Sequence, residues 1–158
     1  MPETSIEPFR PEHLTRLCPR PAARANMAWS GDFAALARAY AANGPALTLR
    51  LDGAIAACGG ICLCWPGMGE AWCVTSPLVE RHPIRFCKEA RKALALLERA
   101  TRAHRVQAHA EAADPRAGRW LAWLGFGNEG LCEAYGPHRE NVYRYARIHA
   151  CNQSHPQP

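Results

Sequence analysis

The cysteines of this 158-residue chain are the side chains whose spacing most directly tests for metal or redox chemistry. Cys58, Cys62 and Cys64 are separated by even numbers of positions and so share one face of a predicted strand, while Cys73 lies on the next strand. A metal site needs close pairs such as Cys-x-x-Cys, or histidines at ligand spacing, and neither pattern occurs. We therefore predict no metal and interpret these thiols as small buried side chains.

Two lone histidines, His82 and His109, are secondary candidates for acid–base chemistry because imidazole titrates near neutral pH. The alternative for each is a structural histidine. The net charge of +5, from 19 Lys and Arg against 14 Asp and Glu, favours an anionic ligand. The basic residues are interleaved with glutamates rather than gathered beside exposed aromatic residues, so nucleic acid is not an expected partner.

The start of the chain lacks the basic and then apolar pattern of a secretory signal, because its first ten residues include Glu3 and Glu7. The apolar stretch 54–65 is too short to span a membrane and contains two glycines, which predicts a buried strand. Eight cysteines indicate a disulfide framework only in a small secreted chain. We therefore expect a cytoplasmic protein with reduced thiols and no membrane partner.

Changes in the period of the apolar residues predict the elements that must position any site. Leu47, Leu49 and Leu51 alternate as in a strand, and Asp52-Gly53 favours a type I′ hairpin turn. An apolar stripe through 83–103 predicts a long central helix. Strands are predicted at 5–9, 47–51, 54–65, 70–76, 106–110, 131–135 and 142–148, and helices at 11–17, 32–42, 83–103 and 114–124.

This order predicts an α+β fold: a mostly antiparallel twisted sheet of about seven strands flanked by about four helices. Residues 1–148 should form one domain, because no linker divides them and a chain of this length can build one core. The polar tail 149–158 is expected to be disordered.

Local sequence in the last third of the chain resembles the GCN5-related N-acetyltransferase (GNAT) superfamily. Leu124-Gly125-Phe126 followed by Glu129-Gly130 is similar to the segment that closes the last short helix in many members, and 145–148 resembles their final strand. Arg119-Trp120-Leu121 before that triplet resembles the GNAT-like proteins of phages and prophages, some of which are internal virion proteins. The resemblance, with the element order, covers most of 5–148 and implies a GNAT-like fold.

The resemblance implies that the pyrophosphate of acetyl-CoA, as co-substrate, binds amide N–H groups at the start of the long helix, where the helix dipole favours an anion. The family's Arg or Gln and two small residues correspond here to Glu80, Pro83 and Arg85, none of which fits. Positive charge nearby can compensate, since arginine binds phosphate in bidentate fashion. The cofactor candidates of this segment are Arg81, His82, Ile84 and Arg85, with Lys88 as a further positive charge.

Three further cofactor contacts follow from the resemblance. The strand 72–76 would pair with the pantetheine arm through the amides of Cys73 and Thr75. Asp114 stands where many members have an asparagine that touches the same arm. The alternative for Asp114 is a helix N-cap, which its residue type suits equally well.

Acyl transfer to an amine needs a base for the amine proton and can use an acid for the departing thiolate. The resemblance implies Glu70 as the base, with a solvated strand-end charge as the alternative. Leu121 replaces the tyrosine that often acts as the acid. Tyr135 or Tyr143 could substitute for it, and each could equally be structural.

Two functions are therefore expected from the sequence. The first is an acetyl-CoA-dependent N-acetyltransferase, in which an unidentified amine acceptor attacks the thioester directly. The second is a non-catalytic GNAT-like phage virion or interaction protein whose cofactor loop has degenerated, located in a phage particle and bound to phage structural proteins. The altered segment 80–85 and the missing tyrosine favour the second, because fold alone does not fix function.

Overall fold

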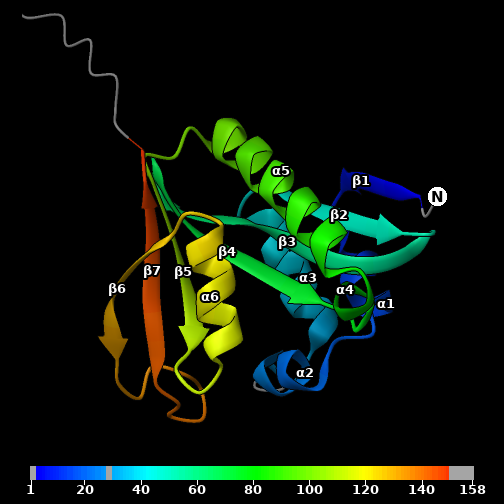
Figure 1. Cartoon of the computed structure of the whole chain (residues 1–158). Coiled ribbons are helices and arrows are strands. Elements are labelled where there is room, and N and C mark those ends of the chain that lie inside the picture. Colours follow the sequence, from blue (N-terminus) through cyan, green and yellow to red (C-terminus); the bar gives the residue numbers. More distant parts are fainter. Residues whose placement is uncertain (1–2, 28–29, 150–158) are drawn as a thin grey trace, which may run out of the picture.

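The computed structural model describes residues 3–27 and 30–149. Within these residues, seven strands form one sheet and six helices flank it (Figure 1). The strands are β1 (Thr4–Pro8), β2 (Ala46–Leu51), β3 (Ala54–Trp65), β4 (Met68–Thr75), β5 (Arg105–Glu111), β6 (Gly127–Cys132) and β7 (Val142–Ile148). The helices are α1 (Pro11–Arg16), α2 (Pro21–Met27), α3 (Phe33–Ala42), α4 (Leu78–Arg81), α5 (Pro83–Thr101) and α6 (Pro115–Trp123). None of the described helices is long and apolar enough to cross a membrane.

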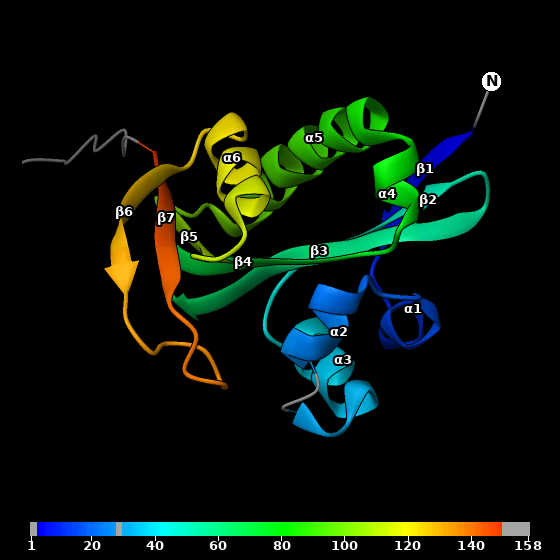
Figure 2. The ribbon, with the colours of Figure 1, turned by 60° about the horizontal axis from the view of Figure 1, so that its bottom comes forward.

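The sheet has the strand order β1-β2-β3-β4-β5-β7-β6. Neighbouring strands are antiparallel except for β4 and β5, which run parallel. Figure 2 shows α5 and α6 on one face of the sheet and α1, α2 and α3 on the other. This arrangement confirms the predicted α+β class and the mostly antiparallel sheet of seven strands.

The two parallel strands at the centre of the sheet separate after a short paired stretch. β4 pairs with β5 only where Met68, Gly69 and Glu70 face 105–107. Beyond Glu70 the strands diverge, as Figure 1 shows, and the edge of β4 that faces β5 loses its strand partner. The sheet therefore opens at its centre. On the sides away from the opening, β4 stays hydrogen-bonded to β3 and β5 to β7.

Local chemistry fixes the turns and helix starts around this opening. Asp52 and Gly53 have φ of 51° and 81°, so the β2–β3 hairpin has the two positive φ angles that a type I′ turn requires. Asp32 accepts hydrogen bonds from two amides in the first turn of α3, at 2.9 and 3.1 Å. Asp114 does the same for α6, at 3.1 and 3.3 Å. Both are N-caps, which hold a helix start in place.

The core is divided by the sheet into clusters on its two faces. Beneath α5 and α6, buried side chains from both helices pack on β5 and β7, and they include Leu94, Val106, Leu121 and Tyr145. On the opposite face, Leu14, Met27 and Ala37 pack on Cys58 and Val74. A third cluster joins the start of α5 to β2 and β3 through Leu49, Leu51, Ala57 and Phe86. These clusters hold the helices that border the central opening.

Two sequence expectations differ from the structure. Helices α2 and α4 were not predicted, so six described helices replace the expected four. α4 is a single turn, too short for a periodic pattern, and α2 is rich in alanine without an apolar stripe. The strand expected at 131–135 is wrong: β6 is Gly127–Cys132, an exposed edge strand whose sequence does not alternate. The tail prediction for 149–158 largely lies outside the described residues, although His149 is described.

Candidate active site

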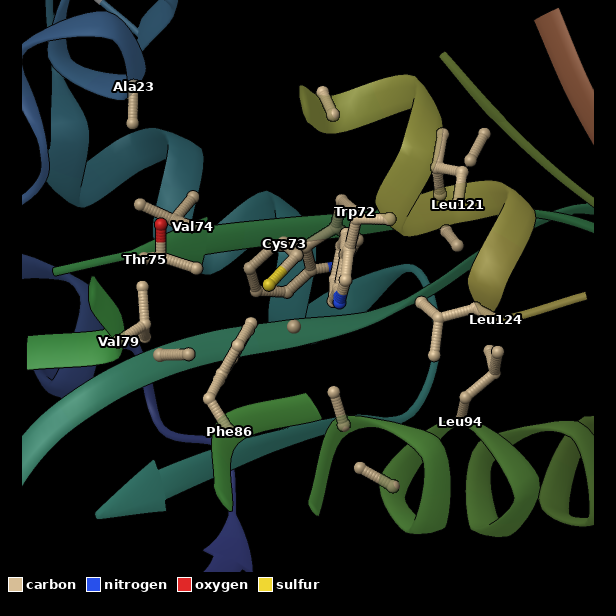
Figure 3. Close-up of a pocket in the computed structure, with 18 of the residues that line it drawn as sticks. Ala23, Trp72, Cys73, Val74, Thr75, Val79, Phe86, Leu94, Leu121 and Leu124 are labelled. Atoms are coloured by element: carbon tan, nitrogen blue, oxygen red, sulfur yellow. The ribbon is translucent and has the colours of Figure 1, made fainter. Parts of the chain in front are cut away.

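A cavity of about 740 Å³ lies where β4 and β5 diverge. Its wall is mostly apolar and comes from both faces of the sheet. From the α5 and α6 side it includes Phe86, Ala90, Leu94, Trp120, Leu121 and Leu124, and from the α2 and α3 side Ala23, Met27, Leu36, Tyr40, Trp72 and Val74. Figure 3 shows β4 crossing this cavity, with Cys73, Thr75 and Phe86 around it. An apolar cavity with a few polar groups is the usual form of a small-molecule site.

The free edge of β4 supplies backbone groups to this cavity. Ser76 donates its amide to Ala56 of β3 at 2.8 Å, whereas the carbonyl of Thr75 points the other way and accepts the amide of Arg20 at 3.1 Å. Because hydrogen-bonding direction alternates along a strand, the backbone groups of Cys73 also face the opening. The amides of Cys73 and Thr75 thus lie, without a strand partner in the described structure, on the cavity wall.

The Cys73 side chain is exposed to the cavity although it lies well inside the molecule. Surrounding protein raises the pKa of its thiol to about 12 through desolvation, which outweighs the opposing effect of Arg20. The thiol is therefore protonated at neutral pH and is no nucleophile, because thiolate is the reactive form. The contribution of Cys73 to the site is its backbone.

The start of α5 differs from the phosphate cradle that the resemblance implies. His82 is the N-cap and makes no side-chain capping bond, and Pro83 follows at the first helical position without an amide hydrogen. Glu80 and Pro83 line the cavity, whereas the described wall does not include the predicted cofactor residues Arg81, His82, Ile84 and Arg85. Ile84 is 71% exposed. The Arg85 guanidinium donates to the Thr4 hydroxyl of β1.

Asp114 is a helix N-cap, the alternative role predicted for it, because its carboxylate accepts hydrogen bonds from two amides of α6. It also lines the cavity, and its contact with the cofactor arm stays a prediction. Leu121, which stands in place of the family's tyrosine, is 7% exposed and packs in the core beneath α6. The cavity wall therefore has no tyrosine hydroxyl at position 121.

Glu70 and His109 meet across the two diverging strands. Glu70 Oε1 lies 2.8 Å from His109 Nδ1, and both residues line the cavity. The pKa of Glu70 is lowered, chiefly by the hydrogen bond with His109, against the raising effect of burial. The carboxylate is therefore ionised at neutral pH and holds the imidazole in one orientation. This contact leaves Nε2 as the ring nitrogen that can accept a proton.

Tyr135 completes this cluster from the β6–β7 connection. Its ring stacks on His109 with centroids 4.5 Å apart and planes at 19°. Burial raises the pKa of Tyr135, and the Glu70 charge adds to that effect, so the hydroxyl keeps its proton. Tyr143 instead faces Ala110 in the β5–β7 ladder and packs on the core beneath α5 and α6. The structure thus brings one of the two predicted tyrosines to Glu70 and leaves the other on the opposite face.

His109 is only a secondary candidate from the sequence, and nothing in the sequence singles out Arg20. Glu70 and His109 are 39 residues apart, and only the parallel register of β4 and β5 makes them neighbours. Arg20 precedes the unpredicted helix α2, and its pairing with Glu80 spans 60 residues. No spacing rule could have found that contact. Among the described residues, no group of three or more His, Cys, Asp or Glu side chains comes together as a metal site.

No protein-family model matches the sequence, and no curated protein matches it. Solved structures are similar in fold. A GNAT-family acetyltransferase from Bacillus anthracis shares 14% identity, with a TM-score of 0.73 over 94% of this chain and 96% of its own. A variant of the spermidine N-acetyltransferase SpeG from Vibrio cholerae shares 12%, with a TM-score of 0.70 over 92% and 93%.

The protein yncA from Salmonella typhimurium, described as an acetyltransferase in a structure with its cofactor acetyl-CoA, shares 14% identity. Its TM-score is 0.66 over 98% of this chain and 97% of its own. At these identities the likeness concerns the fold alone. The chain has the fold of the GNAT acetyltransferases over nearly its whole length.

Proposed function

We propose that the chain is an N-acetyltransferase that transfers an acetyl group from acetyl-CoA to an amine by direct attack. The observation that carries this proposal is one cavity with two complementary ends. Unpaired backbone amides of β4 line it, and the hydrogen-bonded pair of Glu70 and His109 stands at the point where β4 and β5 separate. Donors at one end and a base at the other are what acyl transfer to nitrogen requires.

The acyl donor would lie along the free edge of β4. Its pantetheine arm has amide groups that can pair with the backbone of Cys73 and Thr75 as a further strand would. An amide directed at the thioester oxygen would stabilise the negative charge that develops there. The fit is good along β4 and poorer at the start of α5, where Pro83 lacks an amide hydrogen and Glu80 is negative.

The acceptor would approach from the face that carries Glu70, His109 and Tyr135. Its neutral nitrogen forms a bond to the carbonyl carbon as the carbon–sulfur bond breaks. The amine loses one proton to the Glu70–His109 pair, and the CoA thiolate takes one from the Tyr135 hydroxyl, which is protonated at neutral pH because its pKa is raised. Proton exchange with solvent then restores both groups. The products are the N-acetylated amine and free CoA. Since Glu70 and His109 are coupled, the proton is assigned to the pair.

The altered start of α5 supports a second candidate, a non-catalytic GNAT-like phage virion or interaction protein. The negative Glu80 and the proline at 83 are the observations that favour it, because both weaken a phosphate site. Such a protein would occur in the phage particle with phage structural proteins, whereas the enzyme would act in the cytoplasm. Detection in purified particles would support this candidate, and catalytic acetylation of any amine would count against it.

Thermal unfolding of the reduced protein with and without millimolar acetyl-CoA tests the proposed enzyme first. A ligand at about one hundred times its dissociation constant adds about 2.7 kcal/mol to the free energy of unfolding, which is a rise in Tm of roughly 5–10 °C for a domain of this size. Plain adenine nucleotides at the same concentration control for anion effects. If acetyl-CoA gives no rise beyond those nucleotides, the proposed enzyme is wrong and the second candidate is favoured.

A further inference from the structure

The segment between α1 and α2 brings an arginine to the free edge of β4. The amide of Arg20 donates to the carbonyl of Thr75 at 3.1 Å, so its backbone is fixed beside the strand. Its side chain lines the cavity. Arg20 therefore stands at the wall where the phosphate-bearing part of an acyl donor would emerge from β4 toward α5.

The Arg20 side chain is only partly satisfied within the protein. One terminal nitrogen lies 3.2 Å from Glu80 Oε1, in a pair whose side chains are 31% and 53% exposed. The Nε atom is buried and has no hydrogen-bond partner among the described residues. A buried donor without a partner is unfavourable unless a ligand or water satisfies it. A partly exposed ion pair contributes little, so the guanidinium can exchange Glu80 for a stronger partner.

The charge of Arg20 also reaches into the cavity. It lowers the pKa of the Cys73 thiol, opposing the larger effect of burial, so the guanidinium lies within electrostatic range of the β4 edge. On the other side it contacts Glu80, which occupies the position where the family resemblance implies an Arg or Gln. The acidic residue at 80 and the basic residue at 20 thus form a pair beside the first turn of α5.

We infer that Arg20 is a binding residue for the diphosphate of the acyl donor and supplies the positive charge that position 80 lacks. This inference rests on the proposed function. The guanidinium would leave Glu80 and bind phosphate oxygens with two parallel N–H groups, a geometry that arginine has and lysine does not. The amides of Ile84 and Arg85, at the start of α5, would face the same anion. The negative charge of Glu80 would then weaken the binding of the diphosphate without preventing it.

Binding titrations can separate a phosphate contact from a general effect on the cavity. Acetyl-CoA carries the diphosphate, and S-acetylpantetheine carries only the arm and the thioester. Arg20→Gln should weaken acetyl-CoA binding about tenfold or more, because a charge-assisted hydrogen bond is lost. It should leave the affinity for S-acetylpantetheine unchanged. Arg24→Gln is the matched control, since Arg24 is exposed on α2, the helix that Arg20 directly precedes, and its substitution removes an equal charge.

Each outcome bears on a different claim. Equal weakening of both thioesters by Arg20→Gln, or no weakening of either, would overturn the role of Arg20 in binding phosphate while leaving the proposed function intact. An equal loss in Arg24→Gln would mean that net charge alone acts, and would also overturn it. If the unmodified protein binds neither thioester, the proposed function itself fails and this inference fails with it. Unfolding curves without ligand show whether both variants are folded.

Discussion

Glu70 is the residue whose environment says most about the chemistry of the cavity. A carboxylate beside an imidazole can act as a base itself or can orient the imidazole so that the free nitrogen accepts the proton. The 2.8 Å hydrogen bond with His109 lowers the pKa of Glu70, so the carboxylate is ionised at neutral pH. Replacing it should therefore disable both routes.

We predict that Glu70→Gln lowers kcat by about 10²–10⁴-fold, the usual contribution of a positioned base. The dissociation constant for acetyl-CoA should not change, because the β4 amides proposed to bind the arm are untouched. Steady-state kinetics and a binding titration on the same variant check both statements. A variant that keeps the turnover of the unmodified protein would remove Glu70 from the chemistry. Tyr143→Phe is the control, because Tyr143 lies on the other face of the sheet.

The same contact has a consequence for stability. Because folding lowers the pKa of Glu70, the carboxylate stabilises the fold at a pH above its unfolded pKa, and this contribution is lost as the pH falls through the folded pKa. In Glu70→Gln the loss cannot occur. Acid unfolding curves of the variant should therefore depend less on pH in the acidic range than those of the unmodified protein.

Single residues were predictable where their role follows from local chemistry. Asp32 and Asp114 have the residue type and position of N-caps, and the structure contains both caps. The partners of Glu70 were not predictable, because His109 comes from another strand and Tyr135 from a connection that the sequence assigned to a strand. Contacts of this kind depend on register, and one residue of shift would turn each side chain to the other face.

At the scale of elements, β2 packs closely against β3 at Gly60, next to the strand that lines the cavity. Gly60 is buried, and a Cβ atom at this position would lie 2.6 Å from the Cβ of Ala46 and from the carbonyl oxygen of Pro45. Real side chains do not approach so closely, so the backbone of one strand would have to move. The absence of a side chain at Gly60 therefore sets the spacing of the strands next to β4.

We predict that Gly60→Ala lowers the free energy of unfolding by about 1–3 kcal/mol, the usual cost of overpacking a core. Gly127→Ala is the matched control, because Gly127 is also a strand glycine but is exposed, and its nearest neighbour to an added Cβ is 3.9 Å away. The control should change stability by less than about 0.5 kcal/mol. Urea unfolding of both variants checks this. Similar losses in both would show that the close approach in β3 is not the cause.

The elements that the sequence predicted best are those with a strong period or a specific turn. The strands at 54–65 and 142–148 were predicted with their observed bounds, and the long helix was predicted from its first residue. β6 was misplaced because backbone pairing with β7, rather than buried alternation, holds it in the sheet. The apolar pattern can locate only those elements that bury one face. An exposed edge strand such as β6 and a single-turn helix such as α4 give no such pattern.

At the scale of the whole molecule, the opening between β4 and β5 joins the two faces of the sheet. Residues of α5 and α6 line the cavity from one face of the sheet, and residues of α2 and α3 line it from the face that carries Glu70. Figure 2 shows these two pairs of helices on opposite sides of the sheet. In the proposed enzyme, a donor and an acceptor would reach the same point from opposite faces. The sequence predicted this architecture, but the divergence of the two strands follows from where their ladder ends, which only the structure defines.

This arrangement makes a prediction for amide hydrogen exchange across the molecule. The amides of Cys73 and Thr75 face the cavity without a strand partner in the described structure, so they should exchange faster than those of Trp72 and Val74, which point toward β3. If the acyl donor pairs with this edge, acetyl-CoA should slow exchange at 73 and 75 selectively. Exchange in the ladder between β6 and β7 should not change. Mass spectrometry with fragmentation to single residues measures both regions.

Uniform slowing along the whole sheet would instead mean general stabilisation. Unchanged exchange at 73 and 75 in the presence of bound acetyl-CoA would show that the donor lies elsewhere.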